Sequence, residues 1–153
     1  MKRDLPPAEI RSHWEVKVGL PFLGSNDVGP EFDPEELSAI IGVKPTNQWR
    51  VGDLNQLGAP KRTSGWELKS TAGPTAPLSG HVESLLVAVR GHEAAFAEAA
   101  RRYRVQLECV ISVDPETVSP ELILPLDQLQ ALTQLGIAAI GLGISQPAAS
   151  RTK

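Results

Sequence analysis

The sequence predicts an α+β domain with a mainly antiparallel sheet and helices on one face. Short stretches in which apolar and polar residues alternate recur along the chain and indicate half-buried strands. Segments with apolar residues at helical spacing lie between them. The expected element order is β-α-β-β-α-β followed by α-β. We therefore expect a ferredoxin-like βαββαβ core with a C-terminal αβ extension.

Length and composition fit one globular domain. The chain has 153 residues, of which 41% are hydrophobic and 22% are charged. We expect the domain to span residues 13–145, with a flexible N-terminal arm at 1–12 and a disordered tail at 146–153. The net charge of −3 gives no broad electrostatic reason to bind nucleic acid, so we expect none as a partner.

Three features of the sequence favour a cytoplasmic protein. The single cysteine cannot form an internal disulfide. The start, MKRDLPP, has no apolar segment after its charges and does not resemble a secretory signal. No apolar run approaches the roughly 20 residues that cross a membrane, so we expect no membrane association.

The first strand and the first helix follow from local patterns. Trp14, Val16, Val18 and Leu20 alternate with polar residues or glycine, and Pro21 is expected to end this strand or place it at an edge. Asp33 has the character of an N-cap before Pro34, and Gly42 is suited to end the helix. Its apolar face is formed by Leu37, Ile40 and Ile41.

Two short strands follow, at 48–51 and 65–70, and we expect Trp49 and Trp66 to face each other across this hairpin. The connection at 52–64 is long for a hairpin, which is typical of a functional or mobile loop.

The order of residues from Asp33 to Leu68 resembles a known family. The pattern DPEEL, IIG-x-x-P-T-x-x-W-x-x-G-D and SGW-x-L is similar to the uncharacterised bacterial domain-of-unknown-function family 4279. The resemblance covers roughly Trp14 to Ile144. It implies a compact bacterial α+β domain and brings no established activity or catalytic residue.

The second half predicts two further helical regions, the last two strands of the expected element order, and one additional short strand. Ser79 is expected to cap a helix that Gly91 interrupts, and the strand at 105–113 alternates most clearly. A short strand is expected at 122–124. A leucine-marked helix at 126–135 is expected to end at Gly136, before a last strand at 140–144.

The candidate site lies around the long loop. Asp53 follows Trp49 and Arg50 and has two interpretations: a turn residue that bonds to the backbone, or an acid in a pocket with Arg50 and the two tryptophans. Such a pocket suits a small cation, a peptide or a partner's side chain. The alternative for Trp49 and Trp66 is a hydrophobic minicore. Lys61 and Arg62 add positive charge to the same loop.

Most other chemistries have no pattern in the sequence. The histidines, His13, His81 and His92, lack ligand spacing, so we expect no metal, and His81 is expected to be a neutral surface residue. Cys109 is expected to be a buried, inert thiol. There is no phosphate-binding glycine motif, and we expect no cofactor.

Two classes of function remain. The first is a protein-binding module, such as a toxin-neutralising or accessory protein, with the loop residues Trp49, Arg50, Asp53, Lys61, Arg62 and Trp66 as its contact site. The second is an enzyme whose site is assembled from dispersed residues around Asp53. The absence of a catalytic constellation favours the first. The sequence leaves open whether the protein is a monomer or a homodimer.

Overall fold

The computed structural model describes residues 14–24, 30–113 and 122–145. The N-terminal arm expected at 1–12 and the tail expected at 146–153 lie outside these residues, as does His13.

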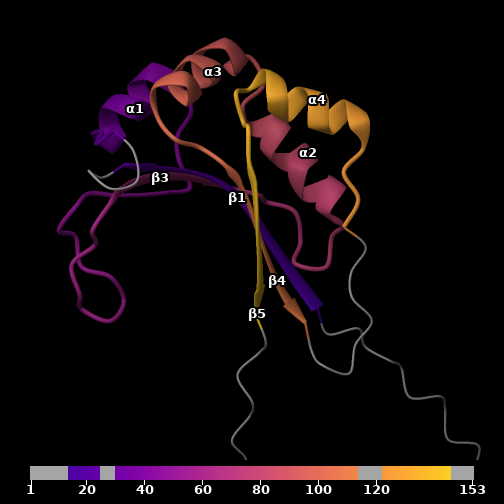
Figure 1. The fold of residues 1–153 in the computed structure, drawn as a ribbon, viewed down its shortest axis with the longest axis horizontal. Helices are drawn as coiled ribbons and strands as arrows, with labels where there is room; N and C mark the ends of the chain where they lie inside the picture. The colour runs from indigo at the N-terminus through magenta and orange to yellow at the C-terminus, as the bar shows by residue number, and fades with distance from the viewer. Residues whose placement is uncertain (1–13, 25–29, 114–121, 146–153) are drawn as a thin grey trace, which may run out of the picture.

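The described residues form one five-stranded sheet in the order β2-β3-β1-β4-β5 (Figure 1). The strands are β1 Trp14–Gly24, β2 Asn47–Trp49, β3 Ser64–Lys69, β4 Leu107–Val113 and β5 Ile140–Ser145. β1 pairs antiparallel with β3 and β4, and β2 pairs antiparallel with β3. β5 pairs parallel with β4. The sheet is therefore mixed, because the crossover between β4 and β5 returns the chain in the same direction.

The four helices formed by the described residues lie on one side of this sheet (Figure 1). They are α1 Pro34–Ile41, α2 Leu78–Ala88, α3 Glu93–Arg102 and α4 Leu126–Gln134. The core lies between the helices and the sheet. At its centre Phe22, Trp66 and Phe96 are fully buried, and their rings meet edge to face.

Pro21 neither ends β1 nor lies at the edge of the sheet. β1 is the central strand and continues to Gly24. The Val18 carbonyl accepts the N–H of Ser70, which follows β3, whereas Leu23 donates its N–H to the Arg104 carbonyl on the other side. The nitrogen of Pro21 therefore faces the β4 side, and pairing with β4 stops at Gly19. Pro21 lacks a backbone N–H, but no β1–β4 hydrogen bond is lost, because Pro21 lies beyond the end of that pairing.

The signals around α1 are confirmed. Asp33 accepts the Glu35 N–H at 2.8 Å, Pro34 begins the helix, and Gly42 ends it in the left-handed region with φ 77°. These signals are local, because each acts through bonds within one helical turn. Leu37 and Ile41 of the expected apolar face are buried, whereas Ile40 is 40% exposed.

Later boundaries differ in part from the prediction. α2 begins after Pro77, with no side-chain cap, so Ser79 lies inside the helix and does not cap it. Gly91 separates α2 from α3 at φ 84°, and Gly136 follows α4 at φ 80°. Residues 122–124 form no strand.

Candidate functional site

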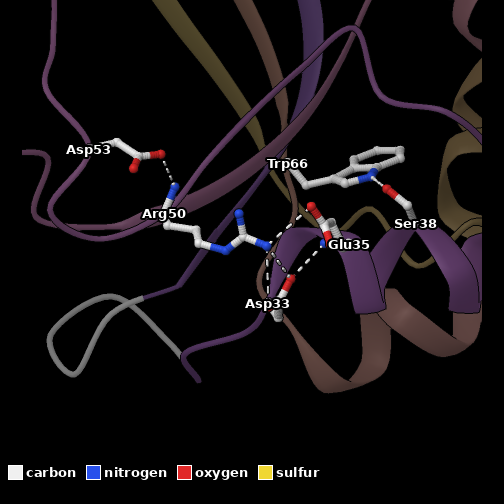
Figure 2. A network of polar contacts seen from close by, with 6 residues as sticks. All are labelled: Asp33, Glu35, Ser38, Arg50, Asp53 and Trp66. Atoms are coloured by element: carbon white, nitrogen blue, oxygen red, sulfur yellow. Dashed lines mark hydrogen bonds and ion pairs between the residues drawn. The ribbon is translucent and has the colours of Figure 1, made fainter.

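Trp66 is a core residue and not part of an open pocket. It is completely buried, and its indole Nε1 donates a hydrogen bond to Ser38 Oγ at 2.9 Å. Figure 2 shows the ring directed at Ser38 on α1. Trp66 therefore joins the sheet to α1 and satisfies its one polar group in doing so.

Trp49 and Trp66 do not face each other, contrary to the sequence prediction. Trp49 pairs with Gly65, and Trp66 pairs with Gln48. Because successive side chains on a strand point to opposite faces, this register places the two tryptophans on opposite faces of the sheet. Trp66 faces the helices, and Trp49, which is partly buried, lies on the helix-free face.

The Trp49 ring lies between Gly65 and Lys61. A Cβ built on Gly65 would lie only 2.0 Å from Cζ2 of Trp49, so the ring occupies the space of a side chain there. The Lys61 Nζ lies over the ring, 4.4 Å from its centroid, as in a cation–π contact. Two residues of the predicted site, Trp49 and Lys61, are therefore in contact.

Arg50 connects the start of the long loop to the start of α1 (Figure 2). Its guanidinium lies 3.2 Å from Asp33 and 3.3 Å from Glu35. The Glu35 backbone N–H and the Arg50 charge together hold the pKa of Asp33 below its usual value. The carboxylates of Glu35 and Asp33 in turn raise the pKa of Arg50. Arg50 is thus committed to a contact within the chain.

Asp53 is a turn residue. Its carboxylate accepts the backbone N–H of Arg50 at 2.7 Å, which closes the turn at the base of the loop (Figure 2). Asp53 does not share a pocket with Trp66, because that ring is buried on the helix side.

Residues 50–63 form a folded element, which we call the projecting loop (Figure 1). The Gly52 N–H donates to the Lys61 carbonyl, and the Lys61 N–H donates to the Asp53 carbonyl. Near the tip, Asn55 Oδ1 accepts the N–H groups of Leu57 and Ala59 at 2.9 and 3.0 Å. The loop therefore projects from the sheet with its backbone tied across its width.

The projecting loop exposes apolar side chains that the sequence reasoning missed. Leu57 at the tip is 93% exposed, and Leu54 is 70% exposed. Arg62 is exposed on the same loop. The available signal was two leucines inside a loop rich in turn residues, where polar residues are usual. The predicted site included only the charged residues of this loop and left the two leucines out.

His81 is buried and not at the surface as predicted. It is 2% exposed, its Nδ1 lies 2.8 Å from Ser70 Oγ, and its Nε2 has no hydrogen-bond partner in the described structure. Burial lowers its pKa, with a smaller opposing effect from the Gly73 backbone, so the neutral form is favoured. The reason for the error is that α2 turns its first turn toward the core.

His81 borders a groove of about 330 Å³ beside the end of β3. Charged side chains of both signs surround the groove: Lys17, Glu67, Lys69 and Glu108. The groove and the projecting loop lie far apart, because α2 and the loop are at opposite sides of the view in Figure 1. His81, Arg50 and Asp53 therefore do not converge.

Cys109 is buried on the core face of β4, as predicted. Burial raises the pKa of its thiol, which disfavours the reactive thiolate. Within residues 14–24, 30–113 and 122–145, no three His, Cys, Asp or Glu side chains gather as metal ligands.

The fold and loop define a class of protein: a small α+β sheet protein with helices on one face and one structured loop projecting from the sheet. The family model described as Domain of unknown function (DUF4279) matches residues 15–140. The chain belongs to this family, which confirms the resemblance seen in its sequence. No curated protein and no solved structure matches the chain. In the part of the chain that is described, no helix has the length and apolar character to cross a membrane.

Proposed function

We propose that the protein is a binding module that holds a macromolecular partner, a protein, through its projecting loop. The observation that carries this proposal is the exposure of Leu57 at the tip of a loop that is tied by its own hydrogen bonds. Loops on a rigid scaffold often carry function, and a preorganised loop loses little entropy on binding.

The chemistry of the loop suits a protein surface. Leu54 and Leu57 supply apolar anchors, and the ammonium group of Lys61 lies over the Trp49 ring. Arg62 is exposed on the same loop. Protein interfaces are enriched in aromatic residues and arginine, and this loop offers both beside its exposed leucines. Trp66 supports the scaffold from the core.

An enzyme site around Asp53 gains no support from the same geometry. The Asp53 carboxylate bonds to the Arg50 backbone, and the Arg50 guanidinium pairs with Asp33 and Glu35. Both side chains therefore already make structural contacts, and binding through the loop leaves these contacts in place.

We further propose a bacterial origin, a location in the cytoplasm and a single domain for this protein. A bacterial protein of the cytoplasm, made of one domain at 13–145, is in keeping with the single cysteine, which is buried, and with the one core that the described residues form. We also propose that β1 to β4 form a ferredoxin-like unit, since β1 lies antiparallel between β3 and β4 and β2 pairs with β3. β5 and α4 would be its extension.

Affinity capture tests the proposed function. The full chain and a Leu54→Ser, Leu57→Ser double variant are used as baits in a lysate of the source organism. The expected result is a partner that the wild-type bait captures and the double variant loses. Leu126→Ser is the matched control, because Leu126 lies in α4 and is also 70% exposed. Equal capture by the loop variant and the wild type would contradict the proposal.

A further inference from the structure

One edge of the sheet is open and apolar. β5 is the last strand in the sheet order, and no strand among the described residues lies beyond it. Ile140, Leu142 and Ile144 are in register with Leu107, Cys109 and Ile111 of β4. The β4 residues are buried, whereas Ile140, Leu142 and Ile144 are 49%, 57% and 74% exposed. The apolar face of the sheet thus extends past the cover of the helices.

Within the part of the chain that is described, no strand pairs with the outer backbone of β5. The Leu107 N–H donates to the Ala139 carbonyl, so the odd-numbered residues of β5 turn their backbone groups toward β4. The N–H and carbonyl groups of Ile140, Leu142 and Ile144 therefore point away from the sheet. β5 contains no charged residue and no proline, the devices that usually protect an edge strand from pairing.

Residues 140–144 of β5 form a palindrome, and Ser145 lies outside it. It reads Ile-Gly-Leu-Gly-Ile, centred on Leu142. When two copies of this strand pair antiparallel about Leu142, each of residues 140–144 meets the same residue type: isoleucine meets isoleucine, glycine meets glycine, and Leu142 meets Leu142. The outward backbone groups of Leu142 make this central pair a hydrogen-bonded one. A shift of one residue would pair Leu142 with a glycine. It would also turn the apolar side chains of one strand to the opposite face of the sheet.

We propose that β5 is the contact strand of a homodimer in which two copies form a continuous ten-stranded sheet. A two-fold axis through the Leu142 pair makes the contact self-complementary, as in most symmetric dimers. No like charges meet within the paired strands, and the two apolar rows cover each other. This surface is separate from the projecting loop and leaves it free.

Cysteine crosslinking of the full chain tests this register. Opposed residues in a hydrogen-bonded antiparallel pair have Cα atoms roughly 5.5 Å apart, within the range of a disulfide. Leu142→Cys should therefore link to its own copy under mild oxidation. Ile140→Cys is the matched control, because its opposite residue is Ile144 and two copies of position 140 lie about 14 Å apart. The wild type, with Cys109 buried, should not link.

Sedimentation and hydrogen exchange complete the test. The wild type should sediment as a dimer, and Leu142→Lys should weaken dimerisation by at least about 100-fold, because it opposes two ammonium groups on the axis. In the variant, the amides of residues 140, 142 and 144 should exchange faster, while 141 and 143 stay protected by β4. A wild type that stays monomeric at high concentration overturns the proposal. So does a dimer in which Leu142→Cys links no faster than Ile140→Cys.

Discussion

The Trp49 indole occupies the space in which Gly65 would carry a side chain. The two residues are opposite each other on β2 and β3, and a Cβ on Gly65 would lie 2.0 Å from the ring. This contact fixes the ring on the helix-free face of the sheet. The ring in turn supports Lys61, so the base of the projecting loop depends on the absence of one methyl group.

Gly65→Ala should therefore destabilise the protein through Trp49. The added methyl must displace the ring, and overpacking of this kind costs about 1–3 kcal/mol in the free energy of unfolding. Urea melts of Gly65→Ala, Trp49→Ala and the double variant measure the coupling. The cost of Gly65→Ala should largely disappear when Trp49 is alanine. An equal cost in both backgrounds would contradict the contact.

Trp66 should matter more to stability than Trp49. Trp66 is fully buried, whereas Trp49 is partly exposed. Truncation of a buried tryptophan to alanine costs about 3–5 kcal/mol, and Trp66→Ala should fall in this range. Trp49→Ala should cost clearly less. Chemical denaturation of the two variants compares them directly, and a reversed order would show that the core does not centre on Trp66.

Asp53 should control the order of the projecting loop without controlling the fold. Asp53→Ala removes the acceptor for the Arg50 N–H and should speed hydrogen exchange at Gly52 and Lys61, whose amides bond across the loop. The melting temperature should hardly change, because the loop is exposed. Lys44→Ala, an exposed change outside the loop, serves as the control. Unchanged exchange at both amides would show that the turn does not depend on Asp53.

Buried His81 should make stability depend on pH. An unfolded histidine titrates near 6.5, and burial lowers the pKa of His81 in the folded protein. Below that pH the unfolded chain binds more protons than the folded one, so the free energy of unfolding should fall as pH falls through about 6.5. His81→Gln, which does not titrate, should lack this component. Parallel pH dependence of the two proteins in this window would contradict the neutral, buried state.

The local features of the fold could be predicted from sequence, because their causes are local. The start and end of α1 depend on Asp33, Pro34 and Gly42, each of which acts within one helical turn. The alternation at 105–113 predicts which side chains of β4 are buried. The relation between strands could not be predicted in the same way. Trp49 pairs with Gly65 and not with Trp66, and this difference of one residue in register places the two rings on opposite faces of the sheet. The residue types within the two strands do not determine this register.

The sequence also could not predict how a residue lies relative to elements that are distant in the chain. His81 is buried because α2 packs its first turn against the sheet, while Pro21 is tolerated because β4 stops pairing with β1 at Gly19. For the same reason, the residues predicted to form one site lie in three different places in the structure. Lys61 and Trp49 are together on the loop side, Arg50 and Asp53 build the base of the loop, and Trp66 belongs to the core.

Crosslinking from the tip of the projecting loop tests the central claim most directly. A photoreactive amino acid replaces Leu57 in the full chain, which is expressed in the source organism and irradiated. Because Leu57 is 93% exposed, the substitution should leave the fold intact. The account predicts a covalent adduct to one specific protein from position 57, and no such adduct from the same group at Leu126. The absence of an adduct at position 57, or the same adducts from both positions, would contradict binding through the loop.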